Sequence, residues 1–151
     1  MHEHGVDPGP YLTEVHEISL SALTPDPALR AAIAALPGRK FVYTNGCAPY
    51  AERVLAARGL SGLFEGVFGV EHADFHPKPA RAAFETVFAK AGIRPTQAAM
   101  FEDDARNLAV PHEMGLSTVH VAPERAPGAH VHHHTNDLPR FLAALRHSRH
   151  S

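Results

Sequence analysis

The sequence predicts one α/β domain in which helices cover both faces of a parallel β-sheet. Short apolar segments typical of buried strands alternate with longer segments whose apolar residues recur at helical spacing. The chain has 151 residues, of which 44% are hydrophobic, so it is long enough to bury one core. Its 13 Pro and 11 Gly stay below the share found in low-complexity chains, which excludes disorder as a description of the whole chain.

The order of the elements follows from turn and capping residues. Asp26 is placed to cap a helix, and Pro27 suits the first helical position because its missing N–H costs nothing there. Nearer the N-terminus, Tyr11, Leu12 and Val15 have helical spacing. We expect helices over residues 27–36, 51–58, 79–91, 111–115 and 137–145, and strands over residues 40–44, 66–70, 98–101 and 117–121.

Charge and composition exclude several classes of partner. The formal charge is −2 and the Lys and Arg residues are scattered singly, which argues against nucleic acid. No run of about 18 apolar residues is present, so we expect no membrane-spanning helix. A single cysteine cannot form a disulfide within the chain, and this favours a reducing, cytoplasmic location.

Candidate functional residues lie where strands end, and parallel sheets bind ligands at the carboxyl ends of their strands. The hydroxyl of Thr44 and the amides of Asn45 and Gly46 suit an anion, although an ordinary strand-ending turn has the same composition. Lys78 stands between two prolines directly before the helix predicted over residues 79–91. The prolines restrict its backbone and hold its ammonium at a helix N-terminus; the alternative is a surface lysine.

Three consecutive carboxylates, Glu102–Asp104, follow the apolar strand predicted over residues 98–101. Like charges this close raise one another's pKa unless a cation neutralises them, and carboxylate oxygens suit Mg²⁺. A solvated loop that caps the next turn is the alternative. With Thr44 and Lys78 at the same sheet edge, the carboxylates favour phosphoryl transfer, in which positioning and charge neutralisation do most of the catalysis.

Two other patterns point to different chemistry. Residues Cys47–Arg53 match C-x5-R, the signature of cysteine phosphatases. We reject this reading because Pro49 has no amide to offer a phosphate and Glu52 would repel one. Four histidines gather in a Pro- and Gly-rich stretch without a carboxylate or thiolate at fixed spacing, so we predict a solvated loop rather than a metal site. They are His130, His132, His133 and His134.

Three of these features resemble, in order and spacing, motifs of the haloacid-dehalogenase-like (HAD) phosphatase superfamily. Residues Phe41–Gly46 resemble its second motif, Lys78 in the Pro-Lys-Pro setting its third, and Phe101–Leu108 its fourth. The resemblance runs from about Pro8 to Leu145 and implies a Rossmann-like core with a parallel sheet flanked by helices.

The wording of residues 44–46, 51–55 and 102–108 is closest to the pyrimidine 5′-nucleotidase-like branch, although Tyr50 stands where that branch commonly has His. The resemblance implies that Thr44 and Lys78 take part in catalysis. It also implies a substrate-binding role for four residues and a Mg²⁺ site. The substrate-binding residues would be Thr44, Asn45, Gly46 and Lys78, and Asp103 would bind the metal, with Glu102, Asp104 and Asn107 around it.

The family's first motif, D-x-D-x-[TV], is absent: no two aspartates of this sequence are separated by a single residue. That motif ends the family's central strand and supplies its aspartyl nucleophile. The resemblance therefore implies an N-terminally truncated chain that begins inside the helical cap and lacks the central strand. We expect a cap remnant over residues 1–22, an incomplete core over 23–147 and a tail over 148–151. Two mid-sheet strand edges would then be unpaired. Either those strands close up, a second chain fills the gap, or the protein is marginally stable.

The sequence thus predicts a Mg²⁺-dependent phosphatase lineage that acts on a small phosphorylated metabolite or nucleotide. This polypeptide is expected to be inactive alone, because it lacks the nucleophile. The alternative is a non-catalytic phosphate-binding module, or one that a partner chain complements.

Overall fold

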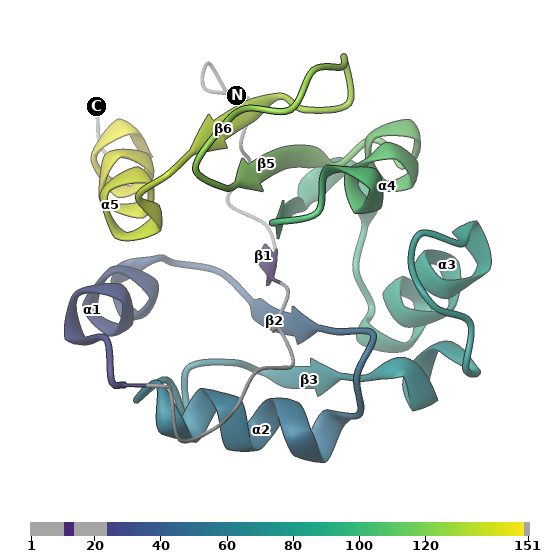
Figure 1. The fold of residues 1–151 in the computed structure, drawn as a ribbon, viewed down its shortest axis with the longest axis horizontal. Helices are drawn as coiled ribbons and strands as arrows, with labels where there is room; N and C mark the ends of the chain where they lie inside the picture. The colour runs from purple at the N-terminus through teal and green to yellow at the C-terminus, as the bar shows by residue number, and fades with distance from the viewer. Residues whose placement is uncertain (1–10, 14–23, 150–151) are drawn as a thin grey trace.

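The structure, a computed structural model, describes residues 11–13 and 24–149. It is an α/β fold with one six-stranded parallel sheet flanked by helices, which confirms the predicted fold class (Figure 1). The strands are β1 (Tyr11–Thr13), β2 (Lys40–Tyr43), β3 (Gly66–Phe68), β4 (Ala99–Glu102), β5 (Ser117–Val121) and β6 (His133–Thr135). The α-helices are α1 (Pro27–Ala35), α2 (Ala48–Ala57), α3 (Arg81–Ala91), α4 (Ala109–Met114) and α5 (Leu138–Arg149). Short 3₁₀ helices are η2 (Val70–Ala73), η3 (Pro95–Gln97) and η4 (Ala105–Leu108).

β1 lies at the centre of the sheet, whose strand order is β3-β2-β1-β4-β5-β6. Leu12 is in register with Phe41 of β2 on one side and with Met100 of β4 on the other. The expectation that the central strand is missing is therefore wrong. The helical conformation that the spacing predicts for Tyr11 and Leu12 is also wrong, because both residues lie in β1. Val15, the third residue of that pattern, lies outside the described residues.

The physical reason lies in backbone pairing. A segment between β2 and β4 satisfies hydrogen-bonding groups along two apolar strand edges, and local residue spacing carries no information about that gain. The presence of β1 removes the reason for expecting a second chain at this place. The rest of the predicted cap segment lies outside the described residues, so the domain boundaries stay predictions.

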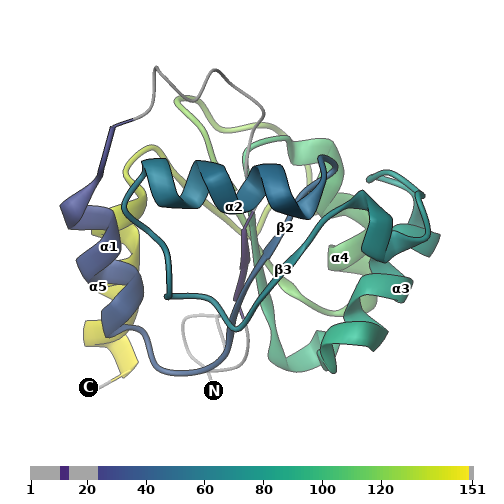
Figure 2. The same cartoon turned by 90° about the horizontal axis from the view of Figure 1, so that it is seen from below.

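Helices cover both faces of the sheet. Figures 1 and 2 show α1 and α5 on one side of the sheet and α3 and α4 on the other. The buried residues of α2 belong to the same core cluster as those of α1 and α5, and those of α3 to the second cluster. No helix in the described part of the chain combines the length and the apolar character needed to cross a membrane.

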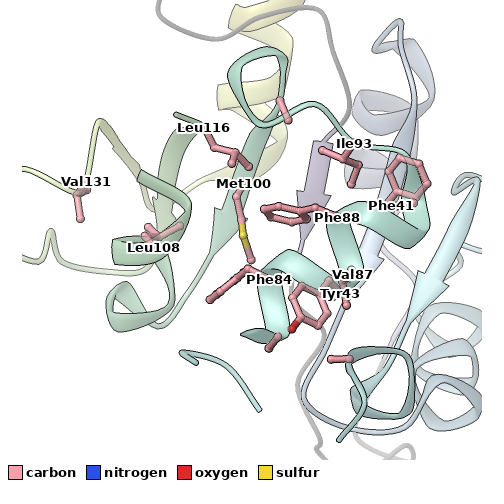
Figure 3. Packing of buried hydrophobic residues seen from close by; sticks show 14 residues of the cluster. Phe41, Tyr43, Phe84, Val87, Phe88, Ile93, Met100, Leu108, Leu116 and Val131 are labelled. Carbon is pink, nitrogen blue, oxygen red and sulfur yellow. The ribbon is translucent and has the colours of Figure 1, made fainter. Parts of the chain in front are cut away.

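The core beneath α3 is rich in aromatic residues. Phe84 and Phe88 of α3 lie against Met100 of β4 (Figure 3). Phe84 also meets the ring of Tyr43 edge-on, with the ring centroids 5.9 Å apart. Because Phe84, Tyr43 and Met100 are all fully buried, this core anchors α3, and with it the segment that precedes α3, to the sheet.

Helix ends follow the predicted capping chemistry in part. The Asp26 carboxylate accepts a hydrogen bond from the Leu29 amide at 3.0 Å and caps α1, which begins at Pro27 as predicted. α2 begins earlier than predicted, at Ala48, and α3 later, at Arg81.

The histidine-rich segment is more ordered than the sequence indicates. His133 and His134 lie in β6, which pairs with β5, so the prediction of a solvated loop is wrong for them. His132 exchanges two hydrogen bonds with the buried Thr118: its amide donates to Thr118 Oγ1 at 3.0 Å, and its Nδ1 accepts the Thr118 amide at 3.1 Å. The pairing partner is far along the chain, which is why the local composition did not reveal β6.

The His132 contacts predict a loss of stability at mildly acidic pH. Desolvation lowers the pKa of His132, and the nearby rings of His112 and His133 add to this effect. The folded state therefore binds fewer protons than the unfolded state just below the ordinary histidine pKa of about 6.5, so stability falls as the pH drops through that value. The midpoint of thermal unfolding is expected to fall less between pH 7.5 and 5.5 in His132→Asn, whose Oδ1 can still accept the Thr118 amide, than in the wild type. Equal slopes would contradict the assignment.

Candidate functional site

The turn after β2 is tied to itself and to the segment after β3. The buried Thr44 Oγ1 accepts the Gly46 amide at 3.0 Å, and the Gly46 carbonyl accepts the Val70 amide at 2.9 Å. Gly69 permits this close approach, because a Cβ there would lie 2.8 Å from the Gly46 carbonyl oxygen. The turn therefore has a fixed position at the carboxyl edge of the sheet.

The Asn45 side chain holds the backbone of Lys78. Its Oδ1 accepts the Lys78 amide at 2.7 Å, and its Nδ2 donates to the Lys78 carbonyl at 3.2 Å. Lys78 does not stand at the N-terminus of α3, which begins at Arg81, so that part of the sequence interpretation is corrected. The backbone of Lys78 is held by the turn after β2 rather than by the N-terminus of the helix.

The ammonium of Lys78 lies in a buried ion pair. Nζ donates to Glu102 Oε1 at 2.9 Å and to the Tyr43 carbonyl at 3.3 Å, and it lies 4.7 Å from the centroid of the Tyr43 ring. Both charged side chains are 0% exposed. The structure thus joins the predicted lysine to the first of the three predicted carboxylates.

Burial and charge act in opposite directions on this pair. Burial lowers the pKa of Lys78 and raises the pKa of Glu102, and the attraction between the two charges opposes both changes. Burial also raises the pKa of the Tyr43 hydroxyl, with a further contribution from Glu102. That hydroxyl has no hydrogen-bond partner among the described residues.

The carboxylates of the acidic run have different partners. Glu102 Oε2 accepts the amides of Asp103 at 3.2 Å and of Asp104 at 3.3 Å. The Asp104 carboxylate pairs with Arg106 at 2.7 Å, and this hydrogen bond is the main cause of the lowered pKa of Asp104. Asn107 is buried in η4, where its backbone N–H donates to the Asp104 backbone carbonyl at 2.9 Å.

These partners decide which metal site the residues could form. Within residues 11–13 and 24–149, no group of three or more His, Cys, Asp or Glu side chains is arranged to hold a metal ion. Glu102 is paired with Lys78 and Asp104 with Arg106. Asp103, the ligand that the family resemblance implies, follows directly after β4 at the carboxyl edge of the sheet. Mg²⁺ often binds one or two carboxylates together with waters and a phosphate. A single carboxylate from Asp103 fits a Mg²⁺ ion whose remaining ligands are waters and a phosphate.

The residues of the C-x5-R pattern do not form a phosphate cradle. Cys47 is exposed before α2, and the Arg53 guanidinium lies over the Tyr50 ring, 5.3 Å from its centroid. The amide of Ala48 at the start of α2 donates to the Glu71 carboxylate, at 3.1 Å for the nearer oxygen. A carboxylate of the chain itself thus occupies the anion-attracting end of this helix.

The sequence did not indicate three side chains that shape this region. They are Glu71, His120 and the side chain of Asn45, which was predicted to act through its backbone amide alone. Nε2 of His120 in β5 lies 3.0 Å from the Asp103 carbonyl oxygen. The only sequence signal for His120 is a titratable residue between two valines in a predicted strand, and its register with Glu102 becomes known only from the structure. No comparable signal marks Glu71, which contacts α2 from η2.

A parallel sheet with polar and charged residues from β2, from the segment before α3 and from β4 at its carboxyl edge defines the doubly wound α/β class, in which ligands bind at the strand ends. Residues 4–115 match the profile of the haloacid dehalogenase-like hydrolases. The chain belongs to this hydrolase family, and the resemblance at that level is confirmed. No curated protein sequence matches the chain.

Solved structures support the same fold. The L-2-haloacid dehalogenase from Xanthobacter autotrophicus superposes with a TM-score of 0.70 at 19% identity, over 84% of this chain and 63% of that one. Another L-2-haloacid dehalogenase gives 0.65 at 22% identity, over 80% and 54%. A predicted phosphoglycolate phosphatase from Haemophilus somnus gives 0.63 at 20% identity, over 78% and 54%. The chain thus spans between 54% and 63% of the length of these proteins.

Proposed function

We propose that this chain binds small phosphate esters at the carboxyl edge of β2 and β4, as a member of the phosphatase lineage among HAD-like hydrolases. Lys78 is the observation that carries the proposal. Its backbone is held by Asn45 and its ammonium by Glu102, both at the sheet edge where ligands of this fold class bind. Burying a lysine costs free energy, and perturbed charged groups gather at functional sites.

The neighbouring groups supply the rest of an anion site. The Thr44 hydroxyl and the Asn45 backbone amide would donate to phosphoryl oxygens, and Lys78 would neutralise their charge. The Gly46 amide, which donates to Thr44 Oγ1, holds this turn in place. A bound Mg²⁺, held by Asp103, would add further charge neutralisation. We infer a pyrimidine 5′-nucleotide as the substrate class, because the amino-acid sequences of residues 44–46, 51–55 and 102–108 resemble those of the pyrimidine 5′-nucleotidase-like branch.

Binding and turnover are separate questions for this sequence. No D-x-D pair is present to supply an aspartyl nucleophile. We therefore propose that the 151-residue polypeptide binds phosphate esters without hydrolysing them.

Calorimetric titration of the full chain with uridine monophosphate, in the presence of Mg²⁺, tests the proposal. The wild type is expected to bind saturably, and Lys78→Met to bind on the order of 10-fold more weakly, because a charge-assisted hydrogen bond is lost. Thr44→Val, which keeps the buried ion pair, is expected to weaken binding as well. Lys90→Met, at a lysine on the solvent side of α3, is the matched control and should bind like the wild type.

Release of phosphate is measured in the same samples. No turnover above buffer is expected from any variant. Binding that is equal in Lys78→Met, Thr44→Val and the wild type would contradict the site assignment, as would turnover that survives Lys78→Met. If the wild type releases phosphate and Lys78→Met does not, the site assignment stands, and a nucleophile other than an aspartate of a D-x-D pair must be present.

A further inference from the structure

His120 is a buried histidine that the proposed function does not use. It lies in β5, is 5% exposed, and is in register with Glu102 of β4 on one side and His134 of β6 on the other. Its ring is 5.8 Å from the His134 ring, centroid to centroid. Nε2 of His134 lies 2.8 Å from the carbonyl oxygen of Ala122, and this contact orients the His134 ring.

The two residues Asp103 and Asp104, here named the Asp103 loop, connect β4 to η4. Glu102 Oε2 accepts the amides of both residues. The backbone carbonyl oxygen of Asp103 faces β5 instead and lies 3.0 Å from His120 Nε2. The amides of the loop are therefore tied to β4, and its carbonyl is tied to β5.

We propose that His120 is a positioning residue that holds the Asp103 loop in the geometry needed to bind a divalent cation beside a phosphate. The proposal rests on the proposed function, because Asp103 is the ligand assigned there. A carbonyl can only accept, so Nε2 carries the hydrogen of this contact. Nδ1 has no hydrogen-bond partner among the described residues, so the contact with Asp103 is the polar interaction that fixes the ring.

The geometry of imidazole allows a matched pair of variants. The side-chain amide of Gln reaches the position of Nε2, so His120→Gln can still donate to the Asp103 carbonyl. The shorter amide of Asn reaches only the position of Nδ1, so His120→Asn loses that hydrogen bond while it buries a similar polar group. A role in packing alone would not separate the two variants in this direction.

The test measures Mn²⁺ affinity of the full chain by electron paramagnetic resonance in the presence of inorganic phosphate. His120→Asn is expected to bind Mn²⁺ on the order of 10-fold more weakly than the wild type, the usual loss when a group that orients a metal ligand is removed. His120→Gln is expected to restore most of that affinity. Nitrogen-15 NMR of the wild type should show the Nε2–H tautomer of His120.

The outcomes separate this inference from the proposed function. Equal Mn²⁺ affinity in the wild type, His120→Gln and His120→Asn, together with a loss in Asp103→Asn, would overturn the inference and leave the metal ligand in place. A wild type that binds no Mn²⁺ with phosphate would overturn the metal site of the proposed function, and the inference with it. An Nδ1–H tautomer would overturn the inference alone.

Discussion

Replacement of Glu102 by Gln is expected to lower the free energy of unfolding by about 3–5 kcal/mol, because it leaves the Lys78 ammonium buried without its counter-charge. The two side chains are 0% exposed and joined at 2.9 Å, so water cannot take over the role of the carboxylate. Urea denaturation followed by circular dichroism measures the loss. The expected result is a lower midpoint with an unchanged dependence on urea concentration.

Two further variants isolate the pair. Lys78→Met combined with Glu102→Gln removes both charges and is expected to be more stable than Glu102→Gln alone, because no unpaired charge remains buried. The control is Glu85→Gln, which breaks an ion pair with Arg81 in which both side chains are exposed, and should cost less than about 0.5 kcal/mol. Additive losses in the double variant would contradict the coupling.

Replacement of Phe84 by Ala is expected to cost about 3–5 kcal/mol, the range for a large side chain removed from a packed core. Phe84 is fully buried between Tyr43, Phe88 and Met100 (Figure 3), so the cavity would lie in the layer that fixes α3 to the sheet. The loss is measured as the change in the free energy of unfolding in urea.

The chain offers a matched control in Phe75, which is 72% exposed. Phe75→Ala removes the same side chain from a solvated position and should change the free energy of unfolding by less than about 0.5 kcal/mol. Similar losses for the two variants would contradict the assignment of Phe84 to the core.

Much of the fold is local in origin and is therefore predictable from the sequence. Asp26 and Pro27 mark the start of α1, and the apolar alternation of residues 117–121 marks β5. The meeting of Thr44, Lys78 and Glu102 at one edge is predictable too, since parallel strands end at the same edge of the sheet.

The remaining features depend on contacts between distant parts of the chain. β1, described over Tyr11–Thr13, becomes a strand because two neighbouring strands pair with it. Asn45 reaches Lys78 across 33 positions, and His120 reaches Asp103 across 17. Local spacing and composition contain no record of these pairings, so the sequence indicated the residues of the site better than their partners.

The most direct test of the central claim, that the edge between β2 and β4 binds phosphate, is a titration of the nitrogen-15-labelled chain with inorganic phosphate and Mg²⁺. Amide shifts report the location of binding. The largest saturable changes are expected at Asn45 and Gly46 after β2, and at Asp103 and Asp104 after β4. Shifts centred on residues 130–134, or shifts without saturation at that edge, would contradict the account.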